Sequence, residues 1–83
     1  MITAAQMRAA RAMLRIDQRA LAQLSGLSLP TIQRMEASDG VVRGNVDSLM
    51  KLVGALQRAG IELIAEGAAS AVGGRARGSG SDR

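Results

Sequence analysis

The stretch QRALAQLSGLSLPTIQRME, residues 18–36, decides the fold. Two short segments with helical apolar spacing flank Gly26, a residue that can adopt the positive φ required where a helix ends. Asp17 and Ser28 stand directly before these segments, as N-cap residues do. Pro30 falls in the first turn of the second segment, where a missing N–H costs little. The stretch predicts two helices, from residue 18 to about 24 and from 29 to about 37, joined by a tight turn.

A helix is expected on each side of this pair. Thr3-Ala-Ala-Gln6 matches a capping box, so the preceding helix should start at Thr3 and end near Met13 or Leu14. After a Ser38-Asp39-Gly40 loop, another helix should run from about Val46 to Ala59, where Gly60 stops it. Its expected apolar stripe consists of Leu49, Leu52, Val53 and Leu56.

The C-terminal part of the chain changes character. Residues 61–66, IELIAE, are partly β-branched and predict a strand or extended arm with no partner in the chain. A second copy could pair with it, so Ile61, Leu63 and Ile64 are expected to form a dimer interface. Residues 67–83 are rich in Gly, Ala and Ser and are interpreted as a flexible tail. The predicted architecture is all-α, with four to five helices in residues 1–66 and a short C-terminal strand or arm.

The composition excludes several kinds of chemistry. The 83 residues include no Cys, no His and no aromatic side chain. Disulfides, the usual zinc sites and imidazole catalysis are therefore absent, and we expect no cofactor, no metal and no enzymatic activity. The core must consist of aliphatic residues and Met, and we interpret the methionines at positions 7, 13, 35 and 50 as fillers of that core.

The net charge is +4, and ten of the eleven basic residues are Arg, which suits recognition of phosphates and base edges. This modest excess permits nucleic-acid binding without establishing it. No apolar run approaches the roughly 18 to 20 residues of a membrane span. The N-terminus also lacks the pattern of a secretory signal, so a cytoplasmic protein with no membrane association is expected.

Three segments together resemble a known family. Ile16-Asp-Gln-Arg-Ala-Leu-Ala22, Ser25-Gly-Leu-Ser28 and Thr31-Ile-Gln-Arg-Met-Glu36 look like the corresponding parts of lambda-repressor-like helix-turn-helix regulators of the Cro/CI (Xre) type. The resemblance covers about residues 5–60. It implies a helix-turn-helix domain in which the helix from Leu29 to about Ala37 is the recognition helix.

The resemblance also implies roles for individual residues. Gln18 matches a residue that contacts a DNA phosphate, as do Arg43 and Asn45, and Arg11 and Glu36 match an internal salt bridge. Arg19 and Ser28, near the starts of the second and third helices, are further candidates for phosphate contact. For Arg19, a solvated surface charge without a binding role is an equal alternative. The residues expected at the base edges are Leu29, Pro30, Thr31, Gln33 and Arg34.

Physical chemistry agrees with part of this assignment. Arg34 can donate two hydrogen bonds to guanine, and Gln33 can pair with adenine. Leu29 and Pro30 carry no donor and depart from the polar residues common at those positions, so they could only press on a thymine methyl or exclude water. The alternative to base contacts is that Gln33 and Arg34 simply belong to a solvated helix face.

The sequence therefore predicts a transcriptional regulator, as a repressor or autoregulator, that binds a palindromic double-stranded DNA operator as a homodimer. The alternative is a protein-interaction module, such as an antitoxin or anti-activator, that uses the same fold on a protein partner. The basic side chains of Arg75 and Arg77 are interpreted as a solvated tail or as a source of weak, salt-sensitive DNA contacts.

Overall fold

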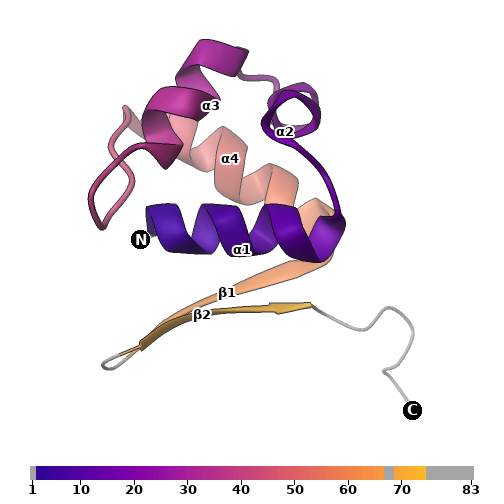
Figure 1. Cartoon of the computed structure of the whole chain (residues 1–83), viewed down its shortest axis with the longest axis vertical. Coiled ribbons are helices and arrows are strands. Elements are labelled where there is room, and N and C mark those ends of the chain that lie inside the picture. Colours follow the sequence, from indigo (N-terminus) through magenta and orange to yellow (C-terminus); the bar gives the residue numbers. More distant parts are fainter. Residues whose placement is uncertain (1, 67–68, 75–83) are drawn as a thin grey trace.

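The computed structural model describes residues 2–66 and 69–74, and its side chains are described as far as Leu63. The described part is mostly helical, as expected (Figure 1). Its elements are α1 (Ala4–Leu14), α2 (Gln18–Ser25), α3 (Leu29–Glu36), α4 (Val46–Arg58), β1 (Ile61–Glu66) and β2 (Ala69–Gly74). Arg75 and Arg77 lie outside the described residues.

Each helix starts where the sequence places an N-cap. Thr3 and Gln6 form the full capping box: Thr3 N–H donates to Gln6 Oε1 at 2.9 Å and Gln6 N–H to Thr3 Oγ1 at 3.1 Å. Asp17 Oδ1 accepts from Ala20 N–H at 2.8 Å at the start of α2. Because these side chains satisfy N–H groups that have no partner within the helix, the four predicted helix starts are confirmed.

The turn between α2 and α3 depends on Gly26. Its φ of +76° is left-handed, and its N–H donates to Ala22 O at 2.9 Å. Leu27 N–H then donates to the same carbonyl at 3.2 Å. The chain reverses here because glycine adopts this conformation without the steric cost of a Cβ.

The core lies where α1, α2, α3 and α4 meet. Leu21, Ile32, Leu52 and Leu56 have no exposed surface. Ala22 is 7 % exposed, and its small side chain allows α2 to lie close to α3 and α4. The other buried apolar residues are Ile2, Ala4, Met7, Ala10, Met35, Val42, Ala55 and Ile61.

The interpretation of the methionines holds for only two of the four. Met7 and Met35 are buried, but Met13 is 46 % exposed and Met50 is 69 % exposed. Met50 follows Leu49 on α4 and lies outside the stripe that faces the core. Because the helix turns by about 100° per residue, Leu52 and Leu56 point inward while Met50 points to solvent.

The sequence had predicted a C-terminal strand without a partner in the chain, but the structure pairs this strand with a second one. β1 pairs with β2 in an antiparallel ladder that runs from Ile61 opposite Gly74 to Glu66 opposite Ala69. The prediction was wrong because the β2 sequence, ASAVGG, consists mainly of Ala and Gly. These residues are depleted in strands, so the segment lacks the β-branched and aromatic residues by which a strand is predicted. The ladder is instead made of backbone hydrogen bonds, which any residue but proline supplies. Part of the region interpreted as a tail is therefore a strand.

Two of the three expected dimer residues on β1, Ile61 and Leu63, pack against the protein's own core. Ile61 is 3 % exposed, and Leu63 is half-buried against the same core. This burial leaves Ile61 almost no surface for a partner, while Leu63 keeps part of its side chain in solvent. α4 contacts β1, and α1 contacts β2, so the hairpin lies against the helical part (Figure 1). Ile64 pairs with Ala71 through its backbone, and its side chain lies outside the described part.

An ion pair joins α1 to α3. Arg11 Nε donates to Glu36 Oε1 at 2.9 Å, and Arg11 Nη2 donates to Glu36 Oε2 at 2.5 Å. The Glu36 side chain is 6 % exposed, and this two-pronged contact gives its carboxylate two hydrogen-bond donors of opposite charge inside the fold. The hydrogen bond to Glu36 raises the pKa of Arg11 above its ordinary value, so the guanidinium stays charged. The pair fixes the C-terminal end of α3 against α1.

Removing one partner of this pair should destabilise the fold. We expect Arg11→Met to lower the free energy of unfolding by about 3 kcal/mol, because it leaves the Glu36 carboxylate buried without its cation. In urea denaturation, the double variant Arg11→Met, Glu36→Met should recover much of that loss. A double variant no more stable than Arg11→Met would contradict the role given to the pair.

Candidate nucleic-acid interface

α3 has one face in the core and one in solvent. Ile32, Met35 and Glu36 are buried, while Pro30, Gln33 and Arg34 are exposed. Figure 1 shows α3 with α2 at the end of the molecule opposite the hairpin. The exposed face of α3 therefore carries a planar cation and a side-chain amide at a protruding end of the fold.

The two remaining predicted base-contact residues have structural roles. Leu29 is half-buried against the core, so its side chain is partly withdrawn from solvent. Thr31 is half-buried, and its Oγ1 accepts a hydrogen bond from Ser28 Oγ at 2.8 Å. The structure thus brings three of the five predicted residues to the surface and leaves the other two partly covered.

Ser28 and Asn45, both predicted to contact phosphate, cap helices. Ser28 Oγ accepts from Thr31 N–H at 3.2 Å, and Asn45 Oδ1 accepts from Ser48 N–H at 2.7 Å. Both residues are exposed, so the first turns of α3 and α4 still face solvent. An anion bound at either turn would meet backbone N–H groups at the positive end of a helix dipole.

The cap at Ser28 gives a measurable stability effect. Ser28→Ala should lower the free energy of unfolding by about 1 kcal/mol, because the Thr31 N–H loses its acceptor. Ser28→Asp should preserve stability, since Asp is an equally good cap. Thermal denaturation followed by circular dichroism compares the variants. Equal stability of Ser28→Ala and the wild type would show that the hydroxyl does not act as a cap.

Gln18 and Arg19 are the first two residues of α2. Gln18 is half-buried and Arg19 is exposed. Asp17 caps the helix through its carboxylate, so one acidic group lies beside Arg19 at the same end. Gln18 is the first residue of α2 and keeps part of its side chain in solvent, as a contact to a DNA phosphate requires. The exposed Arg19 fits either a phosphate contact or a solvated surface charge with no partner role.

The loop after α3 and the end of α3 form a hollow that the sequence did not predict. The sequence predicted a base contact for Arg34 and a phosphate contact for Arg43. Both arginines line this one hollow, Arg34 from α3 and Arg43 from the loop. Ser38 Oγ accepts from Arg43 N–H at 3.0 Å, which brings the loop back toward α3. The hollow is lined by Arg34, Ala37, Ser38, Asp39, Arg43 and Gly44.

Backbone contacts with the N-terminus hold this loop in place. Ala4 N–H donates to Gly40 O at 2.8 Å, and Val42 N–H donates to Ile2 O at 3.0 Å. Val42 is buried in the core, so the loop is anchored on both sides of Val41. Arg43 therefore projects from a fixed backbone. No pattern of residue types in the sequence announces this pairing of the loop with residues 2–4.

The exposed guanidinium groups of Arg34 and Arg43 can donate hydrogen bonds, the Gln33 amide can donate and accept, and the Asp39 carboxylate can accept. In the residues that the structure describes, no group of three or more Asp or Glu is placed to hold a metal ion. Within the same part of the chain, no helix combines the length and hydropathy needed to cross a bilayer.

Compared with models of protein families, with curated proteins and with solved structures, the chain gives no match. The functional assignment therefore depends on the sequence pattern and on this geometry.

Proposed function

We propose that this protein is a sequence-specific DNA-binding transcriptional regulator of the lambda-repressor-like helix-turn-helix type, with α3 as its recognition helix. The observation that carries the proposal is the division of α3. Its apolar side is locked in the core, while Gln33 and Arg34 are exposed at one end of the molecule. A helix held in this way can enter a major groove and present donors to base edges.

The surroundings of α3 support contacts to the DNA backbone. Arg43 shares a hollow with Arg34, and its own backbone is fixed by Ser38 and by the N-terminal residues. The capped first turns of α2 and α4 add N–H groups and the side chains of Gln18 and Asn45. Such contacts set the register of the protein on the duplex, while Gln33 and Arg34 read the sequence.

The proposed operator is palindromic and the proposed regulator is a homodimer. One 8-residue recognition helix reads only a few base pairs, so two copies related by a two-fold axis are needed for a selective site. The two half-sites would lie about 34–36 Å apart, one turn of the double helix. Occlusion of a promoter by the bound dimer would make the protein a repressor or autoregulator.

Selection of bound sequences from random double-stranded DNA tests the proposal. The expected result is a palindromic consensus with half-sites about 10 base pairs apart, centre to centre. Enrichment without any consensus would overturn sequence-specific regulation. A consensus with one half-site would overturn the dimer while leaving α3 as the reading element.

The selected sequence then separates the roles of two arginines. Arg34→Ala should cost about 1–3 kcal/mol of binding free energy and relax the preference at one base pair of each half-site. Arg34→Lys keeps the charge but not the planar fork, so it should lose the same preference. Arg43→Ala and Gln18→Ala should weaken binding to all sequences alike. An unchanged consensus for Arg34→Ala, measured by repeated selection, would refute the assignment of Arg34.

The alternative function, a protein-interaction module, loses some of its support. A protein partner would use the arm at residues 61–66 and the pair Leu29 and Pro30. Ile61 is buried and Leu29 is half-buried, whereas Pro30 is exposed. Salt dependence separates the two functions. Binding to DNA through six to ten phosphates should weaken by roughly 10³- to 10⁵-fold between 50 and 200 mM salt, as measured by fluorescence anisotropy. No binding to any duplex at 50 mM salt would favour a protein partner.

A further inference from the structure

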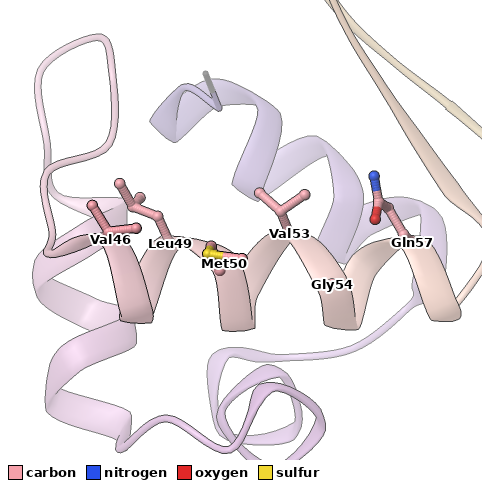
Figure 2. Close-up of a pocket in the computed structure, with 6 residues that line it drawn as sticks. All are labelled: Val46, Leu49, Met50, Val53, Gly54 and Gln57. Carbon is pink, nitrogen blue, oxygen red and sulfur yellow. The ribbon is translucent and has the colours of Figure 1, made fainter.

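One side of α4 is apolar and faces solvent. Val46 is 71 % exposed and Met50 is 69 % exposed, the largest exposures among the big hydrophobic residues of the described part. They line a shallow groove, here called the α4 groove, that is formed by Val46, Leu49, Met50, Val53, Gly54 and Gln57. Figure 2 shows these side chains along a single stretch of the helix.

A continuous apolar strip of this kind differs from scattered exposed hydrophobic residues. Single exposed residues are ordinary, whereas contiguous patches mark interaction surfaces. Gly54 strengthens the argument because glycine is unfavourable inside a helix and neither side of α4 demands it. A Cβ at this position would meet only Arg58 Nη1, at 3.2 Å, the end of a flexible side chain. The glycine leaves a notch in the groove that is bordered by the flexible Arg58 guanidinium, and a long side chain from a partner can occupy it when that guanidinium turns outward.

We propose that the α4 groove binds the same groove of a second copy of this chain, with the two α4 helices antiparallel about a two-fold axis. The proposal rests on the homodimer of the proposed function and names its interface, in place of β1, where the core covers Ile61 and part of Leu63. In this arrangement Met50 of each copy lies near the Gly54 notch of the other.

The charges beside the groove point to a second copy as the occupant. Asp47 stands in the first turn of α4 and Arg58 in the last. They are eleven positions apart, about three helical turns, so they lie on the same edge of α4. A two-fold axis that lies between the two α4 helices and is perpendicular to them makes the helices antiparallel. The same edge of both helices then lies on the same side of the interface. Asp47 of each copy therefore lies beside the partner's Arg58, at both ends of the interface. The edge is therefore complementary to itself.

The remaining charged residue on this edge, Lys51, already has a counter-charge within its own helix. Lys51 Nζ lies 3.3 Å from Asp47 Oδ2 within the same helix. Near the middle of the edge, where two copies of Lys51 approach each other, each ammonium has this carboxylate as its own counter-charge. Asp47 then lies between Lys51 and the partner's Arg58, so each carboxylate serves two cations.

The same axis suits a shared duplex. Figure 1 shows α3 on one side of α4 and the hairpin on the other. In the proposed dimer the two-fold axis runs close to this direction, which leaves both α3 helices at one end, where a single DNA molecule can meet them. One helix face per subunit is smaller than the roughly 800 Å² per partner of a standard interface, so we expect micromolar self-association.

Sedimentation equilibrium at 50 mM salt, without DNA, tests the interface. The wild type should shift from its monomer mass of 8.6 kDa to twice that mass over the micromolar range. Met50→Glu should weaken the association at least tenfold, because it places two carboxylates against an apolar groove. Met13→Glu is the matched control, since Met13 is also exposed but lies on α1. Circular dichroism establishes that each variant is folded.

Charge reversal tests the antiparallel pairing itself. Asp47→Arg alone sets two cations against each other at both ends, and Arg58→Asp alone sets two anions, so each variant should dimerise at least threefold more weakly. An equimolar mixture of the two should form a heterodimer stronger than either variant's homodimer, because all four charges then face their opposites. The helix dipole also favours Asp47 and Arg58 at their positions, but it predicts no recovery on mixing.

Three outcomes overturn the inference: a wild type that stays monomeric through hundreds of micromolar, a dimer unaffected by Met50→Glu, or a mixture no stronger than its components. None of these measurements involves DNA. A monomer that still selects a consensus sequence would refute the interface and keep α3 as the reading element. A dimer with the expected charge behaviour but no DNA binding would do the reverse.

Discussion

The structure depends on the packing of α3 against the rest of the chain. Ile32 and Met35 bury one side of this helix, and Glu36 is held to α1 by Arg11 at 2.9 Å through Nε. Gly26 turns the chain sharply enough for α2 to lie against it. Apolar burial supplies an attraction without direction, whereas the two-pronged ion pair fixes rotation about the helix axis. Together they decide which residues of α3 remain in solvent, and these include Gln33 and Arg34.

This constraint links stability to the proposed function. A recognition helix works only if its exposed side chains keep a fixed direction, because hydrogen bonds to base edges depend on geometry. The sequence has no aromatic residue and no cysteine, so neither ring packing nor a disulfide holds α3 in place. Its core is aliphatic, its helices are capped by Thr3, Asp17, Ser28 and Asn45, and its loop after α3 is tied to residues 2–4 by backbone hydrogen bonds. The hairpin covers the opposite end of the core (Figure 1).

The sequence predicted the elements whose signals are local. Caps at helix starts and Gly26 at a helix end act within a few residues, so the four helices could be placed within one or two positions. The Arg11–Glu36 pair followed from a family resemblance. The sequence could not reveal β2, because a strand of Ala and Gly is stabilised by backbone pairing with a distant segment. The exposure of Met50 and the hollow shared by Arg34 and Arg43 depend likewise on how distant elements meet.

The central claim is that the solvent face of α3 meets DNA. Nuclear magnetic resonance of ¹⁵N-labelled protein titrated with a short duplex at low salt measures this directly, even for a duplex of arbitrary sequence. The account predicts that the largest shift changes fall on the amides of residues 28–34 and on the starts of α2 and α4, with the hairpin unchanged. Shift changes confined to β1, β2 or the far end of α1, with none on α3, would contradict it.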